Sequence, residues 1–206
     1  MNKCGIIAGG TFSTLANIEE CQYIIACDKG YEYCLKENIK PNLFVGDFDS
    51  YHGQVEDDIE KIVLPIRKDD TDTMRAFRIA VEKGFDEIFL YCGLGGRLDH
   101  TFANIQCGIF AANRNVDTTI IDEDNTIIIT NKNEFRLVKK QGYSFSLFAA
   151  DKVEGLYILN SKYQVENISL VNEYPLGQSN DWLDNDVIIK KDSGVLIVIE
   201  SKTISE

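Results

Sequence analysis

The sequence predicts an α/β protein with two domains. A mostly parallel α/β domain is expected over residues 1–123, and an all-β domain of the sandwich or jelly-roll type over residues 124–206. Before about Asp124, short apolar runs alternate with segments of helical periodicity, which is typical of a parallel sheet covered by helices. Beyond that point, short β-like runs follow one another across turns rich in Asn, Asp, Gly and Lys, which is typical of antiparallel all-β domains.

The first domain is expected to contain six strands, each a short apolar run. They are predicted over residues 4–8, 23–27, 43–46, 61–65, 87–92 and 118–121. Strands that alternate with helices form a mostly parallel sheet, whose carboxyl ends lie along one edge. Ligands of such sheets bind at that edge.

Three helices are expected between these strands. The first covers residues 29–37, and Asp70 or Thr71 can cap the second. Asp99 is a plausible cap for the third. The inner face of this third helix is predicted to carry Phe102, Ile105 and Ile109.

The second domain is read from runs of β-type residues separated by turns. Strands are predicted over residues 125–130, 134–138, 144–149, 155–159, 164–170, 186–190 and 195–200. The segment PLGQSNDWLDND, between the predicted strands 164–170 and 186–190, is expected to be polar and turn-rich.

Composition restricts the classes of partner. With 44% hydrophobic and 26% charged residues, the 206-residue chain has the composition of a soluble globular protein. A net charge of −12 disfavours nucleic acid as a ligand, because phosphate backbones need a basic surface. The sequence has no apolar run long enough to cross a bilayer, so we expect a cytoplasmic protein without a membrane partner. The six cysteines form no CxxC pair and are expected to be reduced core residues.

The most informative stretch is LFVGDFDS, in which an apolar run ends in two acids separated by one residue. Asp47 and Asp49 point the same way in an extended chain. Neighbouring carboxylates repel, so the pair calls for a cation, and hard oxygen ligands suit Mg²⁺. A solvated loop is the alternative for an isolated DxD, but the pattern recurs in this chain.

Polar groups follow most of the predicted strands, and the parallel topology is expected to gather them. They are Asp28, Asp47, Asp49, Asp69, Asp72, Arg97 and Asp99. Glycines accompany them at Gly9 and Gly10 and again at Gly95 and Gly96, where backbone amides can approach a phosphate. Carboxylates that hold Mg²⁺, together with an arginine and amides, neutralise the charge of phosphoryl transfer. The sequence therefore predicts a site for a nucleotide with magnesium.

Three residues have two interpretations each. His100 is a candidate for acid–base chemistry, although a histidine just inside a helix is more often a hydrogen-bonded structural group. His52 is expected at the surface. Trp182 is either a core anchor or, beside Ser179 and Asn180, part of a pocket for a heteroaromatic cation.

Four motifs resemble those of the thiamine pyrophosphokinase family, in the same order and with similar separations. They are GDFDS at 46–50, KDDTD at 68–72, GGRLDH at 95–100 with Asn104 beyond it, and GQSND at 177–181. The resemblance implies an α/β nucleotide domain followed by a β-sandwich, and a homodimer that binds thiamine between its subunits. It also implies transfer of the β,γ-diphosphoryl group of ATP to the thiamine hydroxyl, leaving AMP.

The resemblance also implies roles for individual residues. Asp47, Asp49, Asp72 and Asp99 would surround Mg²⁺ and the phosphates, and Arg97 would contact the transferred group. Ser179 and Asn180 would line the thiamine pocket, with Trp182 beside them. The residues expected to bind ATP are Gly9, Gly10, Asp28, Asp69, Thr71, Gly95, Gly96, Arg97, His100 and Asn104. Tyr31 departs from the family pattern, because it is bulkier than the small residue expected there, and nothing is carried over between Gly155 and Gln178.

Two other functions fit parts of the pattern. A haloacid-dehalogenase-like phosphatase also places a DxD after a strand, but usually after the first strand, whereas two predicted strands precede it here. A non-enzymatic sensor of a nucleotide or of thiamine is the second alternative, although simple binding needs fewer acids than this edge carries.

Overall fold

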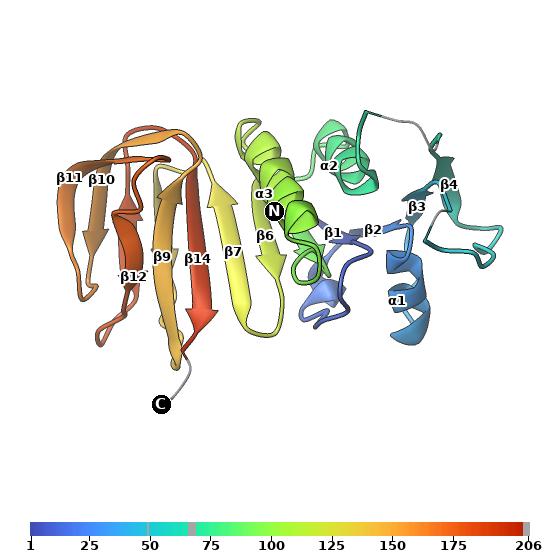
Figure 1. Ribbon diagram of the computed structural model, residues 1–206, viewed down its shortest axis with the longest axis horizontal. Helices are drawn as coiled ribbons and strands as arrows, with labels where there is room; N and C mark the ends of the chain where they lie inside the picture. The colour runs from blue at the N-terminus through green and yellow to red at the C-terminus, as the bar shows by residue number, and fades with distance from the viewer. Residues whose placement is uncertain (49, 66–68, 204–206) are drawn as a thin grey trace. The chain divides into compact units, whose positions relative to one another are not determined.

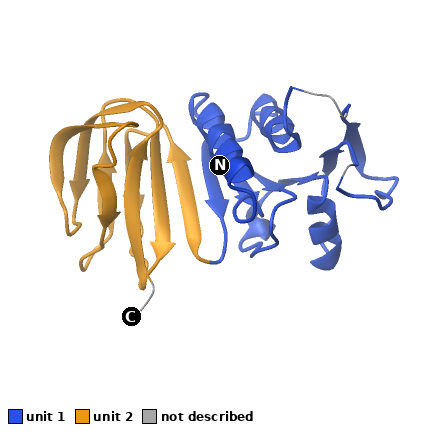
Figure 2. Cartoon of the chain, viewed as in Figure 1, with its two compact units in different colours: residues 1–123 blue, residues 124–206 orange. Residues whose placement is uncertain are grey.

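The protein has a mixed α/β fold composed of two compact units. The computed structural model describes residues 1–48, 50–65 and 69–203. Unit 1 comprises Met1–Glu123 and unit 2 comprises Asp124–Glu206 (Figure 2). Asp49, one of the two acids of the DxD, lies outside the described residues.

Unit 1 contains a parallel sheet. Its strands are β1 (Lys3–Ile7), β2 (Tyr23–Cys27), β3 (Leu43–Gly46), β4 (Glu60–Val63), β5 (Glu87–Tyr91) and β6 (Asp117–Ile121). They lie in the order β6-β5-β1-β2-β3-β4, and each neighbouring pair is parallel (Figure 1). The order reverses beside β1, which pairs with β2 on one side and β5 on the other. In open α/β sheets, the crevice at the carboxyl ends of such strands is the ligand site.

Helices cover both faces of this sheet. Helix α1 (Gly30–Lys36) packs on β1 and β2, whereas α2 (Asp72–Glu82) and α3 (Leu98–Ala112) pack against each other on the other side (Figure 1). A short 3-10 helix (Ile18–Glu20), which the sequence analysis did not predict, precedes β2. The Thr71 hydroxyl accepts a hydrogen bond from the Met74 amide at 3.0 Å, which confirms Thr71 as the cap of α2.

Two expectations for α3 were wrong. The N-cap is Arg97, and Asp99 lies within the first helical turn, where its carboxylate pairs with the Arg97 guanidinium instead of capping the helix. Of the predicted inner face, Phe102 is 62% exposed, whereas Ile105 and Ile109 are half-buried. Small residues face the interior in its place: the buried residues of α3 are Asn104, Cys107, Gly108, Ala111 and Ala112.

One core of unit 1 lies beneath α1. It contains Ile7 of β1, Phe44 of β3 and Tyr91 of β5, packed with Tyr31 and Cys34 of α1. Tyr31, bulkier than the resemblance led us to expect, is a fully buried side chain of this core. All six cysteines are free, and five of them are buried, as expected for reduced core residues.

Unit 2 consists of two antiparallel sheets. Its strands are β7 (Asn125–Thr130), β8 (Glu134–Leu137), β9 (Tyr143–Ala149), β10 (Lys152–Leu159), β11 (Val165–Val171), β12 (Gly177–Asn180), β13 (Val187–Lys190) and β14 (Leu196–Lys202). One sheet has the order β12-β9-β14-β7 and the other β11-β10-β13-β8. Side chains from both sheets, among them Leu147, Leu156 and Ile189, form one shared core.

Strand β12 lies in the segment PLGQSNDWLDND, where the sequence analysis predicted no strand. It pairs with β9 in an irregular register, Gly177 opposite Leu147 and Asn180 opposite Phe145. A Cβ on Gly177 would lie 2.3 Å from the Leu147 carbonyl oxygen, so only glycine permits this approach. Among the described residues, no helix is long and apolar enough to cross a membrane.

Candidate active site

A buried carboxylate stands at the carboxyl end of β2. Asp28 directly follows this strand, has a φ of 45°, and is 4% exposed. Its Oδ2 atom accepts hydrogen bonds from the backbone amide of Ser50, at 2.9 Å, and from the Ser50 hydroxyl. Its Oδ1 atom is buried and has no hydrogen-bond partner among the described residues. The carboxylate is thus oriented through one oxygen, and the other remains available to a ligand.

Two further acids meet Asp28 at this edge. Asp47 follows β3 and Asp72 begins α2, and one carboxylate oxygen from each of the three residues lies within 4.8 Å of the others. Three carboxylates this close repel one another unless a cation lies among them. The convergence of Asp47 and Asp72, which are 25 positions apart in the sequence, follows from the parallel topology.

A cavity of about 210 Å³ adjoins these acids. It holds eight of the residues predicted for the site: Gly9, Gly10, Asp28, Thr71, Asp72, Gly95, His100 and Asn104. Its other lining residues include Ser50 and Thr73, which the sequence analysis missed. Ser50 is the last residue of the motif GDFDS, and Thr73 directly follows the motif KDDTD. Their positions in the motifs could therefore have identified both as lining residues.

The glycine turn after β1 forms one wall of this cavity. The Gly10 amide donates to the Cys92 carbonyl at 3.1 Å, and its own carbonyl accepts from the Tyr33 hydroxyl at 2.6 Å. A Cβ at Gly10 would lie 2.4 Å from the Cys92 oxygen. Glycine is therefore required for the turn after β1 to contact the end of β5.

Two buried side chains, Asn104 and Cys27, fix other walls of this cavity. The Asn104 side chain donates from Nδ2 to the Gly93 carbonyl at 2.7 Å, which ties α3 to the loop after β5. The Cys27 thiol donates to the Asp72 carbonyl at 3.7 Å, which ties β2 to the start of α2. Burial raises the pKa of Cys27 well above its usual range, so the thiol stays neutral and keeps this proton.

Arg97 and Asp99 are exposed at the start of α3. The guanidinium donates to the Asp99 carboxylate over 3.1 Å from Nε and 2.6 Å from Nη2. This hydrogen bond to Arg97 holds the pKa of Asp99 below its usual range and raises the pKa of Arg97. Among the described residues, the acids that converge are Asp28, Asp47 and Asp72, and Asp99 is not one of them.

The remaining predicted nucleotide residues lie around the cavity. His100 is an exposed lining residue whose backbone amide donates to the Asp99 carboxylate at 3.0 Å, and Gly96 is exposed beside Thr11. Asp69 lines a second cavity, of about 420 Å³, together with Asp70 and Arg78, which form a salt bridge of 2.9 Å. His52 is exposed, as expected.

The predicted thiamine residues lie in unit 2, at and after β12. Asn180 is buried and lines a cavity of about 300 Å³, and Ser179 is exposed with a φ of 60°. Trp182 packs against Phe145, with ring centroids 4.7 Å apart, and its indole nitrogen donates to the Leu137 carbonyl at 3.3 Å. These contacts favour the interpretation of Trp182 as a core anchor, and its contact with thiamine stays a prediction.

A parallel sheet whose carboxyl edge carries converging acids and a glycine-walled cavity defines a class, the α/β proteins that bind a ligand at the ends of their strands. A family model described as thiamin pyrophosphokinase, catalytic domain, matches residues 15–120. The chain belongs to the thiamin pyrophosphokinase family, which confirms the resemblance seen in the motifs.

Full-length relatives agree with this assignment. Thiamine pyrophosphokinase from Bacillus subtilis is 30% identical, over 98% of this chain and 99% of the relative. The crystal structure of the Bacillus subtilis thiamine pyrophosphokinase superposes with a TM-score of 0.86 at 25% identity, covering 98% of this chain and 100% of that one. The structure of thiamin pyrophosphokinase from Geobacillus thermodenitrificans has the same fold, with a TM-score of 0.84 at 24% identity, covering 98% and 99% of the two chains.

Proposed function

We propose that this protein transfers the diphosphoryl group of ATP to the hydroxyl of thiamine, giving thiamine diphosphate and AMP. The reaction is that of the family to which the chain belongs. The structural observation that supports it for this chain is that Asp28, Asp47 and Asp72 converge beside a glycine-walled cavity. A transferase of this kind needs a site that positions a triphosphate and neutralises its charge. The protein itself performs little covalent chemistry.

Mg²⁺ is the cofactor that fits these residues. The three converging side chains offer only oxygen atoms, and Asp28 Oδ1 is a buried acceptor without a hydrogen-bond partner among the described residues. Hard oxygen donors of this kind suit Mg²⁺, which is usually held by a few carboxylates together with substrate phosphates. When bound, the ion would neutralise charge on the phosphate oxygens. Asp28, Asp47 and Asp72 would hold it, and the resemblance adds Asp49 and Asp99.

The phosphates of ATP are proposed to lie along the cavity. Gly9 and Gly95 line it, and their amides are the proposed donors of the two glycine turns, because the Gly10 amide already donates to the Cys92 carbonyl. The start of α2 also lines it, through Thr71 and Asp72. Backbone amides at such turns and helix N-termini bind phosphate oxygens. Arg97, exposed at the start of α3, is proposed to leave Asp99 and contact the transferred group.

The two units are proposed to divide the substrates. Unit 1 would bind ATP with Mg²⁺, and unit 2, as a β-sandwich domain, would bind thiamine near Ser179 and Asn180. The family resemblance further suggests a homodimer, and the composition suggests a cytoplasmic enzyme that binds neither nucleic acid nor membrane.

One assay separates this proposal from both alternatives. Purified protein is incubated with ATP, thiamine and Mg²⁺, and the products are separated by chromatography. The proposed reaction yields AMP and thiamine diphosphate in equal amounts, and AMP depends on added thiamine. Release of inorganic phosphate in place of AMP would indicate a phosphatase, and binding of both substrates without turnover would indicate a sensor.

A further inference from the structure

Asp70 is an acid of the motif KDDTD that is not one of the three converging acids. It directly precedes the N-cap of α2, but Thr71 supplies the cap through the hydrogen bond that its hydroxyl accepts from the Met74 amide. The Asp70 carboxylate forms a salt bridge with Arg78 instead. The Arg78 guanidinium donates to it from Nε over 2.9 Å and from Nη2 over 3.4 Å, so one side chain engages both carboxylate oxygens.

This salt bridge joins residues that helical periodicity alone does not bring together. Side chains that meet on a helix are three or four residues apart, whereas Asp70 and Arg78 are eight apart. Eight residues correspond to about 12 Å along a helix axis. Helical side chains point toward the N-terminus, so the long Arg78 side chain covers part of this distance. The extended backbone of Thr71, with φ −70° and ψ 159°, turns the chain out of the helical path, and the salt bridge holds the turned segment beside α2.

The Arg78 guanidinium is also held from α3, which packs against α2 (Figure 1). It lies over the Phe110 ring, 5.1 Å from the ring centroid, a distance at which a cation is attracted to an aromatic face. The neighbouring Cys107 senses both charges of the pair. Burial raises the pKa of Cys107 to about 11, with Asp70 adding to the rise and Arg78 opposing it. The salt bridge therefore lies where the two helices meet.

Three successive residues are thus anchored at the start of α2. Arg78 holds Asp70, the cap hydrogen bond holds Thr71, and the Asp72 carbonyl accepts from the Cys27 thiol at 3.7 Å. Thr71 and Asp72 line the cavity of the candidate active site, and Asp72 is one of the three converging acids. The side chains of Asp70 and Arg78 are 35% and 39% exposed. Ion pairs this exposed add little to global stability, so the main effect of this pair is local positioning.

We propose that Asp70 and Arg78 are a positioning pair that fixes the chain before α2 and thereby holds Asp72 at the distance from the other acids that the proposed cation requires. This inference rests on the proposed function. Neither residue of the pair is among the described residues that line the cavity, so the pair acts through the backbone and not by contact with a substrate. The three acids repel one another, so a segment that is free to move would let Asp72 withdraw from the group and bind the cation less tightly.

The first test measures how AMP formation by Arg78→Met depends on Mg²⁺. Methionine removes the charge and keeps an unbranched side chain that still packs on Phe110. The half-saturating Mg²⁺ concentration is expected to rise about ten-fold, at the low end of the effects of contacts outside a metal ligand, and the KM for thiamine is expected to stay at the wild-type value. Arg114→Met is the matched control, because Arg114 also lies over the Phe110 ring, at 3.8 Å, but donates to the Phe110 carbonyl and not to a carboxylate.

A double-mutant cycle tests whether the two residues act together. Asp70→Asn keeps the size of the side chain, but its amide nitrogen cannot accept the second hydrogen bond from the guanidinium. It is expected to raise the half-saturating Mg²⁺ concentration as much as Arg78→Met does. The double variant is expected to show no further rise, because either substitution already breaks the pair.

Two measurements without substrates test the position of the segment directly. Calorimetric titration with Mg²⁺ alone is expected to show a loss of affinity of about ten-fold in Arg78→Met and Asp70→Asn. Hydrogen–deuterium exchange is expected to become faster at the amides of residues 72–75 in both variants and to stay unchanged in unit 2. Thermal unfolding is expected to stay within a few degrees of wild type, because the pair is partly exposed.

Three results would overturn the inference while leaving the proposed function intact. They are wild-type Mg²⁺ dependence in Arg78→Met and Asp70→Asn, additive effects in the double variant, and unchanged exchange at residues 72–75. If Arg78→Met does not fold, the Mg²⁺ titrations and the exchange of Asp70→Asn decide alone. Failure of the wild-type protein to form AMP from ATP and thiamine would instead remove the proposed function, and the exchange measurement would still test the pair.

Discussion

Ser50 donates two hydrogen bonds to a single carboxylate oxygen of Asp28, one from its backbone amide and one from its hydroxyl. The other oxygen of Asp28 has no hydrogen-bond partner among the described residues and belongs to the group that includes Asp47 and Asp72. The sequence predicts Asp28 as an ATP-binding residue, whereas this geometry makes it one of the acids proposed to hold the cation. If Asp28 holds the proposed cation, Ser50 is the residue that orients this ligand.

Removing the Ser50 hydroxyl is predicted to lower the affinity of the proposed site for Mg²⁺ without abolishing binding. In Ser50→Ala, the Asp28 carboxylate keeps the backbone hydrogen bond and loses the side-chain one. Loss of such an outer contact typically lowers metal affinity by about 10- to 100-fold. Mg²⁺ titration of activity should show a raised half-saturating concentration and a similar maximum rate. Ser50→Thr, which keeps the hydroxyl, is the control, and an equal effect in both variants would contradict the prediction.

Asp72→Asn is predicted to abolish turnover while the fold stays intact. The substitution removes one of three converging negative charges and keeps the size of the side chain. The helix α2 retains its cap, because the Thr71 hydroxyl is unaffected. AMP production should fall below detection, and thermal unfolding should stay within a few degrees of wild type. Asp57→Asn, at an exposed carboxylate that is not one of the three converging acids, is the control. Near-normal AMP formation by Asp72→Asn would remove Asp72 from the catalytic residues.

Unit 2 contains a carboxyl group whose burial makes stability depend on pH. Glu200 is 7% exposed, and burial raises its pKa above the ordinary 4.5, although Lys140 at 3.5 Å partly opposes the shift. The folded state therefore binds this proton more tightly than the unfolded state does. The stabilisation is complete below pH 4.5 and is lost as the pH rises through the folded-state pKa.

Glu200→Gln removes this titration. The difference in Tm between the variant and the wild type should therefore shift in favour of the variant as the pH rises from about 4.5 to 8. Glu166→Gln, at an exposed glutamate of the same unit, is the matched control. A difference that stays constant over this range would show that Glu200 does not carry the effect.

The gathering of acids at one sheet edge was predictable because it depends only on topology. Alternating apolar runs and helical segments predict parallel strands, and parallel strands bring their carboxyl ends together. Asp47 and Asp72 meet for this reason. The family motifs were recognisable because the glycines and acids of the site occur in short runs, such as Gly46 beside Asp47.

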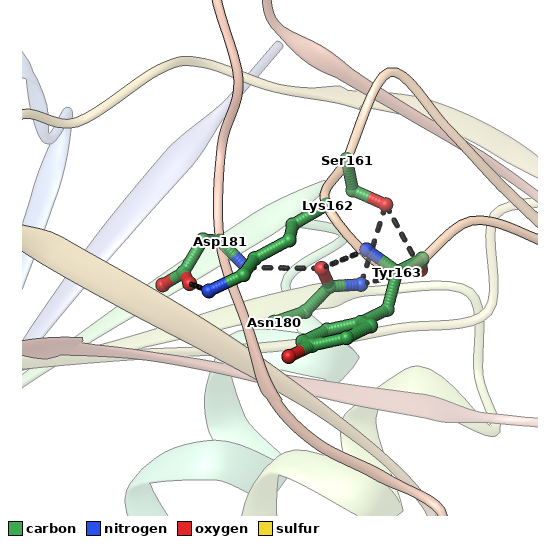
Figure 3. A network of polar contacts seen from close by, with 5 residues as sticks. All are labelled: Ser161, Lys162, Tyr163, Asn180 and Asp181. Atoms are coloured by element: carbon green, nitrogen blue, oxygen red, sulfur yellow. Dashed lines mark hydrogen bonds and ion pairs between the residues drawn. The ribbon is translucent and has the colours of Figure 1, made fainter.

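Features that depend on how hydrogen bonds are distributed were not predictable. The GQSND motif indicates that Asn180 lies near a candidate ligand site. It does not indicate that the side-chain amide of Asn180 is hydrogen-bonded to the backbone of Tyr163, a residue 17 positions away (Figure 3). Strand β12 was missed because its residues GQSN show no apolar alternation and pair through backbone groups. The inner face of α3 was misassigned because a helix that packs closely presents small residues, so that Phe102 faces solvent.

The role of Asp99 divides into two hypotheses that one titration separates. The resemblance makes Asp99 a metal ligand, whereas the structure pairs it with Arg97 and leaves it out of the carboxylate group of the described residues. If its main partner is Arg97, Asp99→Asn lowers turnover by releasing that side chain, and Mg²⁺ binding without nucleotide stays at the wild-type level. Calorimetric titration of wild type, Asp99→Asn and Asp72→Asn with Mg²⁺ tests this, with Asp72→Asn as the variant expected to lose affinity. Equal losses in Asp99→Asn and Asp72→Asn would show that Asp99 reaches the ion, and that the Arg97 pair opens when the metal binds.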